Sequence, residues 1–148
     1  LVRDDGPAAR AALVDRLAAP FADHAIVVAH TARGPADPRL APTRAALAAR
    51  GLAAHDSSAV LGGATGRVVR DAVARLGLSR VVLAGGDSSS HAVTAMGVEA
   101  LGVAAPMVPG APLCRLASRD AAVDKLEVTL KGGQLGAPDY FARVKAGG

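Results

Sequence analysis

The stretch Arg80–Ser90, RVVLAGGDSSS, decides the fold. It opens with Arg80–Ala84, a short apolar run around two valines, which is typical of a strand buried in a parallel sheet. Gly85 and Gly86 follow at once, and a helix is predicted to start within the next few residues. That helix is expected to turn four apolar residues inward: Val93, Met96, Ala100 and Leu101. A buried strand that passes through glycines into a helix is the unit from which layered α/β domains are built.

The segments on both sides repeat this alternation of strand and helix. Further helices are predicted over 8–19, over 43–50, after the glycine-containing connection 61–66 and up to Gly77, and from near Pro138 onward. Further strands are predicted over the buried apolar run 24–29 and the alternating, half-buried run 125–130, whereas the apolar segment 103–108 leads into a predicted loop at 109–112. The sequence therefore predicts one domain over residues 1–148, an α/β layered fold with a mostly parallel sheet flanked by helices.

Composition limits the partners that this chain can have. Apolar residues make up 51% of the sequence, which excludes a disordered segment. Aromatic residues make up only 2%, so the chain lacks the usual stacking platform for single-stranded nucleic acids. The formal net charge is +4, but the basic residues are spread singly between Arg3 and Arg143 and form no run. We therefore expect no nucleic acid among the partners.

Cysteine content and hydropathy indicate the compartment. Cys114 is the single cysteine, so no intrachain disulfide can form, as is usual in a reducing cytosol. The charged start of the chain, LVRDD, has no signal-peptide core, and no apolar stretch approaches the roughly 20 residues of a membrane span. We expect a cytoplasmic protein with no membrane partner.

The candidate ligand site is Gly85–Ser90, where the carboxyl end of a strand meets the start of a helix. Ligands of open α/β sheets bind at that edge. Two glycines let a ligand approach the backbone, and the free N–H groups of a first helical turn favour an anionic oxygen. Ser88, Ser89 and Ser90 can offer hydroxyl groups to a phosphate, and Asp87 beside them can face a magnesium ion or a ribose hydroxyl. Alternatively, Asp87 or Ser88 only caps the helix and the glycines only turn the chain.

A second glycine-containing loop, Lys131–Gly136, again follows a strand and precedes a helix. Lys131 can place one positive charge near a phosphate, while Gly132 and Gly133 let the backbone approach. The other interpretation is a solvated lysine beside a simple turn. If both loops bind ligand, they are expected to open on one edge of the sheet. Neither G-x-x-x-x-G-K-[ST] nor G-x-G-x-x-G occurs, which disfavours a P-loop or an ordinary dinucleotide-binding domain.

The remaining polar candidates are weaker. Ser90 and His91 are adjacent, so on a helix they point about 100° apart and do not form a nucleophile–base pair. The four histidines have no metal-ligand spacing. His30 and Thr31 end a predicted strand and either line the cleft or satisfy loop hydrogen bonds. Cys114 is expected to pack in the core.

Four segments in order carry a family resemblance. They are His30–Pro35 (HTARGP), Ala84–Ser89 (AGGDSS), Pro109–Cys114 (PGAPLC) and Leu130–Gly136 (LKGGQLG), the last followed by Pro138–Phe141 (PDYF). This order resembles the C-terminal nucleotide-binding domain of the four-carbon acid sugar kinase family, which includes threonate and 3-oxo-tetronate kinases. The resemblance covers nearly the whole chain from about residue 24 onward.

The resemblance implies ATP-dependent phosphorylation of a hydroxyl group on a small acid sugar, with ATP and Mg²⁺ as cofactors. By position, Gly85 to Ser88 match the family's ATP-binding Gly-Gly-acid-Thr segment, and Gly133 matches the glycine of its Lys-Ser-Gly loop. We therefore expect cofactor binding at Gly85, Gly86, Asp87, Ser88, Ser89, Lys131, Gly132 and Gly133. Asp87 is the expected metal ligand, and no catalytic residue is assigned.

The sequence departs from the family pattern in three places. Ser88 replaces the usual Thr, and residues 132–135, Gly-Gly-Gln-Leu, replace Ser-Gly-Asn-Phe. The family's upstream Gly-Ser-x-Ser segment and its N-terminal domain are absent. We expect the chain to be the C-terminal lobe of a larger two-domain kinase, inactive by itself, with the N-terminal lobe and the acid sugar as partners. The alternative is a non-catalytic nucleotide- or anion-binding module, or an oligomerisation module that forms a homodimer.

Overall fold

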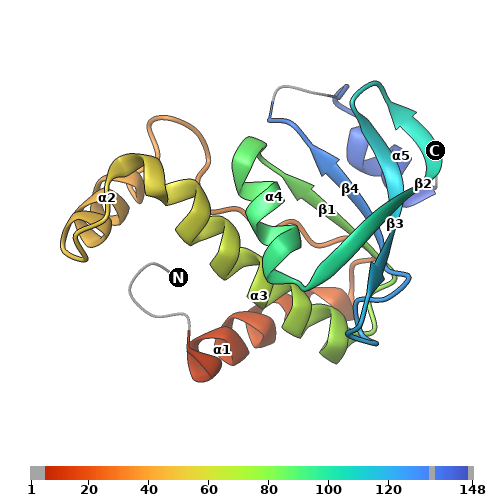
Figure 1. Ribbon diagram of the computed structural model, residues 1–148, viewed down its shortest axis with the longest axis horizontal. Coiled ribbons are helices and arrows are strands. Elements are labelled where there is room, and N and C mark those ends of the chain that lie inside the picture. The colour runs from red at the N-terminus through yellow and green to blue at the C-terminus, as the bar shows by residue number, and fades with distance from the viewer. Residues whose placement is uncertain (1–5, 134–135, 147–148) are drawn as a thin grey trace.

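The computed structural model describes residues 6–133 and 136–146 (Figure 1). The helices are α1 (Pro7–Ala18), α2 (Leu40–Ala48), α3 (Ser57–Leu76), α4 (Gly86–Ala95) and α5 (Tyr140–Ala146), with short 3-10 turns at η1 (Ala19–Ala22) and η2 (Ala54–Asp56). The strands are β1 (Arg80–Ala84), β2 (Val98–Val108), β3 (Ala111–Ser118) and β4 (Glu127–Lys131). Helices and strands lie in layers, and the prediction of an α/β fold is confirmed.

The four strands form one sheet in the order β1-β4-β3-β2. β1 pairs with β4 in parallel, whereas β4 pairs with β3 and β3 pairs with β2 in antiparallel fashion. β1, β4 and β2 therefore run in one direction and β3 runs against them. The sheet is mixed because β2 and β3 form a hairpin, which joins neighbouring strands without a crossover helix.

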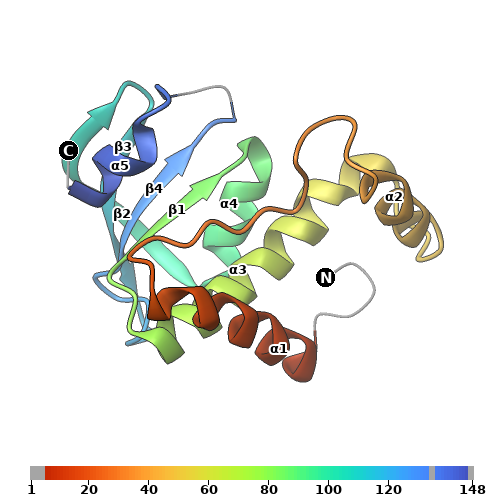
Figure 2. The same ribbon diagram turned by 180° about the vertical axis from the view of Figure 1, so that it is seen from behind.

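The sheet is covered on both faces. Leu83 of β1 packs in a cluster with Val93 and Met96 of α4, while the adjacent Val82 packs against the α5 cluster that includes Tyr140 and Val144. Successive strand residues point to opposite faces, so α4 and α5 lie on opposite sides of the sheet, as Figures 1 and 2 show. A third cluster joins α1 to α3 through Val14, Val68 and Ala72.

Burial on both faces corrects the prediction for 125–130. The observed strand is Glu127–Lys131, and both Val128 and Thr129 have an exposed fraction of 0%. Val128 belongs to the α4 cluster, whereas the Thr129 hydroxyl lies 2.5 Å from the Tyr140 hydroxyl on the α5 side. The alternating pattern predicted one wet face, but α5 covers that face.

The predicted strand 24–29 is wrong. These residues form no strand, and Ile26 and Val28 are 40% and 63% exposed. The segment runs alongside the outer edge of β1 without pairing with it (Figure 2). As a result β1, predicted as a fully buried strand, is an edge strand. A run of β-branched residues supplies only propensity, and a strand forms where a partner and a packing surface exist.

Several other predicted boundaries of helices and loops differ from the structure at or near glycines. Residues 61–66, predicted as a connection, lie inside α3 because glycine is tolerated in a helix where close packing requires it. The helix after Gly85 ends at Ala95, since Gly97 takes a positive φ of 78°; Ala100 and Leu101 therefore lie exposed in β2. The predicted loop 109–112 shrinks to a turn at Pro109–Gly110, and the sequence reading missed β3 altogether. The helices over 8–19 and 43–50, the Gly77 end of α3 and the helix after Pro138 are confirmed within a few residues.

No helix within the described residues is both long and apolar enough to cross a membrane.

Candidate functional site

The structure brings the two predicted loops together at one edge of the sheet. β1 and β4 are parallel neighbours, and Ala84 lies in register with Lys131. The Gly85 N–H group donates a hydrogen bond of 2.9 Å to the Lys131 carbonyl, which continues the ladder by one step. The carboxyl ends of two parallel strands thus place Gly85–Ser90 and the loop after Lys131 side by side, as a ligand site at this edge requires.

Gly85 and Gly86 have different roles in the first loop. Gly85 has φ 137° and ψ 135°, a conformation that L side chains rarely adopt, and a Cβ there would lie 2.7 Å from the Ser88 hydroxyl oxygen. At Gly86, no atom of the described residues outside its chain neighbours and its own helix lies within 4 Å of the position where a Cβ would be. Gly85 is therefore required by the turn itself, whereas the space beside Gly86 is open to a ligand.

The first turn of α4 has its donors available. No side chain of the described residues caps its N-terminus. Ser89 is buried, and its hydroxyl group donates to the Gly86 carbonyl at 2.8 Å, so it braces the turn from inside. Asp87 is exposed, and Ser88 is half-buried. Of the predicted residues, Gly86, Asp87 and Ser88 are accessible to a ligand, while Ser89 supports them from behind.

Lys131 lies folded over its own loop. Its Nζ atom donates to the carbonyls of Gly132 and Gly133 at 3.1 and 3.3 Å and lies 5.7 Å from the centre of the Tyr140 ring. Gly133 is exposed and has open space where a Cβ would be. The ammonium group is thus held at the sheet edge by weak neutral acceptors, which an anionic oxygen can replace. Gln134 and Leu135 lie outside the described residues.

Two glycines of α3 set the position of α4. A Cβ on Gly62 would lie 2.5 Å from the Ser88 carbonyl oxygen and 2.8 Å from the His91 Cβ. A Cβ on Gly66 would overlap the Ala92 backbone, with its Cα at 2.8 Å. Gly62 lies against Ser88 and His91, and the later Gly66 lies against the later Ala92, so α3 and α4 run in the same direction. Both helices therefore start at the same end of the molecule. The close approach fixes the first turn of α4, and nothing in the sequence reading anticipated it.

A groove of about 1150 Å³ runs along the free edge of β1. The segment 25–32 forms its far wall, and Phe21 lines it together with residues of β1 and α3. Its polar lining includes Ser57 and Ser58 at the start of α3 and Ser88 and Ser89 at the start of α4, so the groove reaches the candidate site. The sequence reading missed Ser57 and Ser58; their place at the start of an amphipathic helix was the available signal.

The loop 30–39 holds a compact charge cluster. The Asp37 carboxylate accepts from the backbone N–H groups of Arg33 and Arg39 at 2.6 and 2.9 Å and from two nitrogens of the Arg39 guanidinium. The Arg39 side chain, followed by these backbone donors, holds the pKa of Asp37 well below its ordinary value. His30 and Thr31 do line the groove, and Arg33 Nε and Arg39 Nη2 lie 3.4 and 3.2 Å from the two ring nitrogens of His30.

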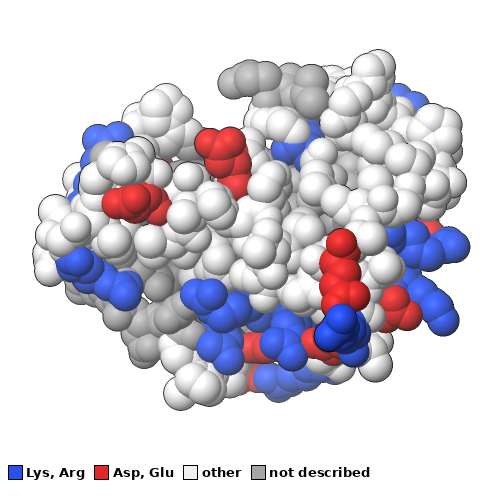
Figure 3. Space-filling view, in the orientation of Figure 1, with Lys and Arg blue, Asp and Glu red and all other residues white. Residues whose placement is uncertain are grey.

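Charges elsewhere are mixed in sign. On the face shown in Figure 3, basic and acidic side chains lie interspersed along the lower edge. Ion pairs join several basic and acidic side chains of the protein, among them Arg10–Asp71, Arg70–Asp120 and Arg119–Glu99. Basic side chains on this face therefore form no continuous stripe.

The other candidates have structural surroundings. Cys114 is buried, and burial raises the pKa of its thiol, so it packs as an apolar residue. Within the described ranges, no group of three or more His, Cys, Asp or Glu residues could hold a metal ion. Asp87, the predicted metal ligand, is exposed in the first turn of α4; a single carboxylate can bind Mg²⁺ where phosphates supply other ligands.

Comparisons with known proteins show the family of the chain. A model of the nucleotide-binding C-terminal domain matches residues 1–141. The chain is 43% identical to a 3-oxo-isoapionate kinase of Paraburkholderia graminis, over 82% of the chain and 26% of that protein. It is 33% identical to a 3-oxo-tetronate kinase of Pseudomonas savastanoi pv. phaseolicola, over 63% of the chain and 20% of that protein. The chain thus spans about a quarter or less of the length of these relatives.

Solved structures give the same fold. A Bordetella bronchiseptica protein, described as a domain of unknown function with bound citrate and as a domain-swapped dimer, matches with 27% identity and a TM-score of 0.53. The match covers 63% of this chain and 23% of that one. A Haemophilus influenzae protein matches 93% of this chain, and 30% of its own, with a TM-score of 0.55 at 18% identity, which supports the fold alone. The resemblance seen in the sequence is confirmed: the chain belongs to the family of nucleotide-binding C-terminal domains found in these sugar-acid kinases.

Proposed function

We propose that this chain is the ATP-holding lobe of a two-domain kinase that phosphorylates a hydroxyl group of a small acid sugar. The observation that carries the proposal is the hydrogen bond from Gly85 to the Lys131 carbonyl, because it joins the two glycine loops at the carboxyl ends of parallel strands. The kinase names of the relatives support the reaction class. The particular acid sugar is left open.

Each accessible residue has a role in this proposal. The N–H groups of Gly86, Asp87 and Ser88 begin α4 without a side-chain cap and would bind phosphate oxygens. Lys131 would leave its loop carbonyls for a phosphate oxygen, with Gly132 and Gly133 allowing the backbone to approach. Asp87 would hold Mg²⁺, whose charge offsets that of the phosphates.

The reaction itself needs positioning more than covalent help from the protein. The acceptor hydroxyl loses its proton as its oxygen forms a bond to the γ-phosphorus, and the bond from that phosphorus to the ADP oxygen breaks. A lobe of backbone donors, one lysine and one metal ligand supplies the ATP half of this arrangement. The acceptor half and the general base are assigned to an N-terminal lobe, since the relatives are about four or more times longer than the matched region.

Assembly follows as a further part of the proposal. The Bordetella bronchiseptica protein is described as a domain-swapped dimer. A homodimer of the full-length kinase, in which this lobe contacts the N-terminal lobe of the partner subunit, is consistent with that description. The rival function is a nucleotide or anion sensor without catalysis.

Calorimetric titration of the chain with ATP tests the proposal, once with Mg²⁺ and once with a chelator. We expect binding in the presence of Mg²⁺ and no phosphorylation of threonate or 3-oxo-tetronate by the isolated chain. Asp87→Asn should weaken ATP binding mainly with Mg²⁺ present, because without the ion Asp87 only repels the phosphates. Equal losses in both conditions would reassign Asp87 to a ribose contact or to helix capping. No ATP binding under either condition would refute the proposal.

A further inference from the structure

The loop 30–39 places a second group of charges beside the candidate site. His30–Ala32 line the groove along β1, and so do Ser88 and Ser89 of α4. In both ribbon views the loop rises at the end of the molecule where α4 begins (Figures 1 and 2). Arg33 directly follows these groove-lining residues in the chain.

The loop is held in place by its own hydrogen bonds. The Asp37 side chain is only 2% exposed although the loop lies at the surface, because its oxygens accept from Arg33 and Arg39. The Asp37 N–H group donates to the Gly34 carbonyl at 3.1 Å, and the Leu40 N–H group donates to the Asp37 carbonyl at 3.0 Å. Arg33 is therefore presented by a preorganised turn.

The charges of this loop do not cancel. Arg39 pairs with Asp37 at 2.6 Å, which uses the single carboxylate of the loop. Arg33 contributes only its backbone N–H group to that carboxylate, and its side chain makes no described ion pair in residues 6–133 and 136–146. The Arg33 Nε atom lies near one ring nitrogen of His30, and the Arg39 guanidinium lies near the other. One guanidinium charge of the loop is left over, and Arg33, which carries it, is exposed next to the groove-lining residues His30–Ala32.

We propose that Arg33 binds an oxyanion, a carboxylate or a phosphate, of a small molecule held between this loop and α4. A guanidinium presents paired N–H donors that match both groups, and a rigid turn reduces the ordering cost of binding. The assignment to a kinase substrate rests on the proposed function. The anion site itself does not, because it follows from the charge and geometry of the loop.

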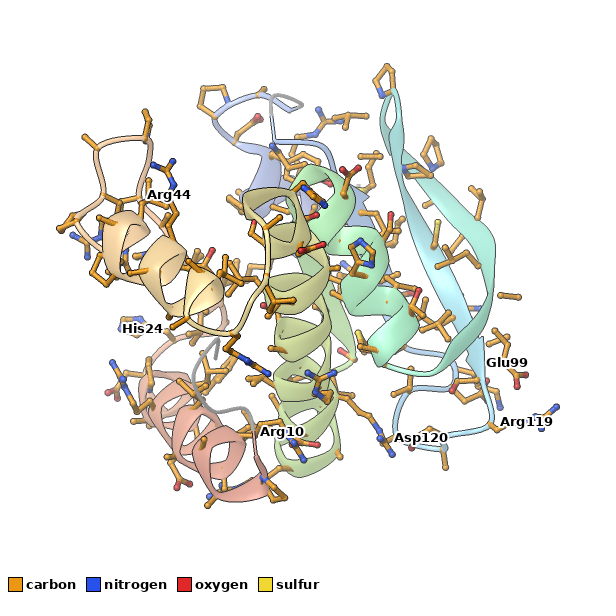
Figure 4. The ribbon with its side chains drawn as sticks, turned by 60° about the vertical axis from the view of Figure 1, so that its left-hand side comes forward. Arg10, His24, Arg44, Glu99, Arg119 and Asp120 are labelled. Atoms are coloured by element: carbon orange, nitrogen blue, oxygen red, sulfur yellow. The ribbon has the colours of Figure 1, made fainter. Side chains whose placement is uncertain are left out.

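The test is a calorimetric titration of wild-type chain and Arg33→Gln with three probes: inorganic phosphate, ATP with Mg²⁺, and a four-carbon sugar acid. We expect Arg33→Gln to weaken at least one of them about tenfold or more, the loss of one charge-assisted contact. Arg119→Gln is the matched control, since it removes the same charge. Figure 4 shows Arg119 beside Glu99, on the opposite side of the molecule from α2. It should leave all three affinities unchanged.

The probes separate the sources of the anion and the two proposals. A loss confined to the sugar acid assigns a carboxylate to Arg33, and a loss for phosphate or ATP assigns a phosphate. Normal affinity of Arg33→Gln for every probe that the wild type binds, with an unchanged circular dichroism spectrum, overturns the inference and leaves ATP binding intact. Arg33-dependent binding of phosphate without any binding of ATP would keep the inference and remove the kinase proposal.

Asp37→Ala distinguishes a built site from a simple charge effect. This variant gains one net positive charge, so a nonspecific attraction would make anion binding tighter. The proposal requires weaker binding, because Arg33 loses the turn that holds it. Tighter binding by Asp37→Ala overturns the inference.

Discussion

The two sides of β1 differ in how they are packed. On one side β4 pairs with all five residues of the strand, and the cluster between the sheet and α4 buries Leu83 to 6% exposure. On the other side the segment 25–32 stands off across a groove, and Val28 remains 63% exposed. β1 (RVVLA) and the segment 24–29 (HAIVVA) are both rich in apolar, β-branched residues, so composition alone does not tell which of them forms a strand. Pairing of β1 with β4 fixes the sheet edge where the candidate ligand site lies, whereas the segment on the free side of β1 contributes one wall of the groove.

Gly86→Val tests the packed side where it meets solvent, and the largest effect is expected there. Among residues 6–133 and 136–146, no atom outside the helix itself and the chain neighbours lies within 4 Å of the Cβ position of Gly86, so the fold should tolerate the branched side chain. The same side chain fills the space in front of the first turn of α4. We expect ATP binding to fall below detection in calorimetry while the thermal unfolding midpoint stays close to that of the wild type. A folded variant that binds ATP normally would show that the loop is only a turn.

Gly66→Ala tests the packing behind that edge. The added methyl group would overlap the Ala92 backbone, which cannot move without displacing α4. We expect the free energy of unfolding to fall by about 3 kcal/mol in urea titration, at the upper end of overpacking costs.

Gly63→Ala is the matched control on the same helix, where the nearest atom is Arg67 Nη1 at 3.5 Å. It should be neutral or stabilise the protein by up to about 1 kcal/mol, since alanine is the better helix former. Equal losses for both variants would mean that α3 and α4 do not pack closely through the Gly66 face.

Gly85 and Gly66 show how far the sequence could predict the structure. The strand at Arg80–Ala84 and the turn at Gly85 follow from local pattern, because a buried apolar run and a glycine at positive φ are local requirements. Gly66 in α3 does not, because its role depends on a helix that lies elsewhere in the chain. The two glycine-containing loops were expected to open on one edge of the sheet, but the register that places Gly85 beside Lys131 is visible only in the fold.

The misread strands have the same cause. Residues 24–29 have strand propensity without a partner among the described residues. In contrast, β3 has a partner, β2, which the sequence analysis took for a helix end and a short apolar segment. Pairing across a hairpin decides both cases, and pairing is not a local property. In the site, Ser57 and Ser58 were missed for the related reason that the start of α3 was placed too late.

Lys131→Ala measures what the second loop adds to the packed edge. The contacts of the ammonium group within the described part of the chain are the carbonyls of Gly132 and Gly133 and the Tyr140 ring, so its removal should leave the fold unchanged. We expect ATP affinity to fall about ten- to a hundredfold, or roughly 1.5–3 kcal/mol, the worth of one charge-assisted contact. Calorimetry at fixed Mg²⁺ measures it. Unchanged affinity would place this side chain in solvent and remove the second loop from the site.

Val28→Ser tests the free side, and its effect should be the smallest. Val28 is 63% exposed and belongs to no strand, so losing its apolar surface should change the free energy of unfolding by less than about 0.5 kcal/mol. Leu83→Ala, on the packed side of β1, should cost about 2–5 kcal/mol by the same urea titration, because it opens a cavity against α4. A cost above about 1 kcal/mol for Val28→Ser would mean that the segment 24–29 packs onto the edge of β1 in solution. Both edges of β1 would then be packed, and the groove along its free edge would be closed.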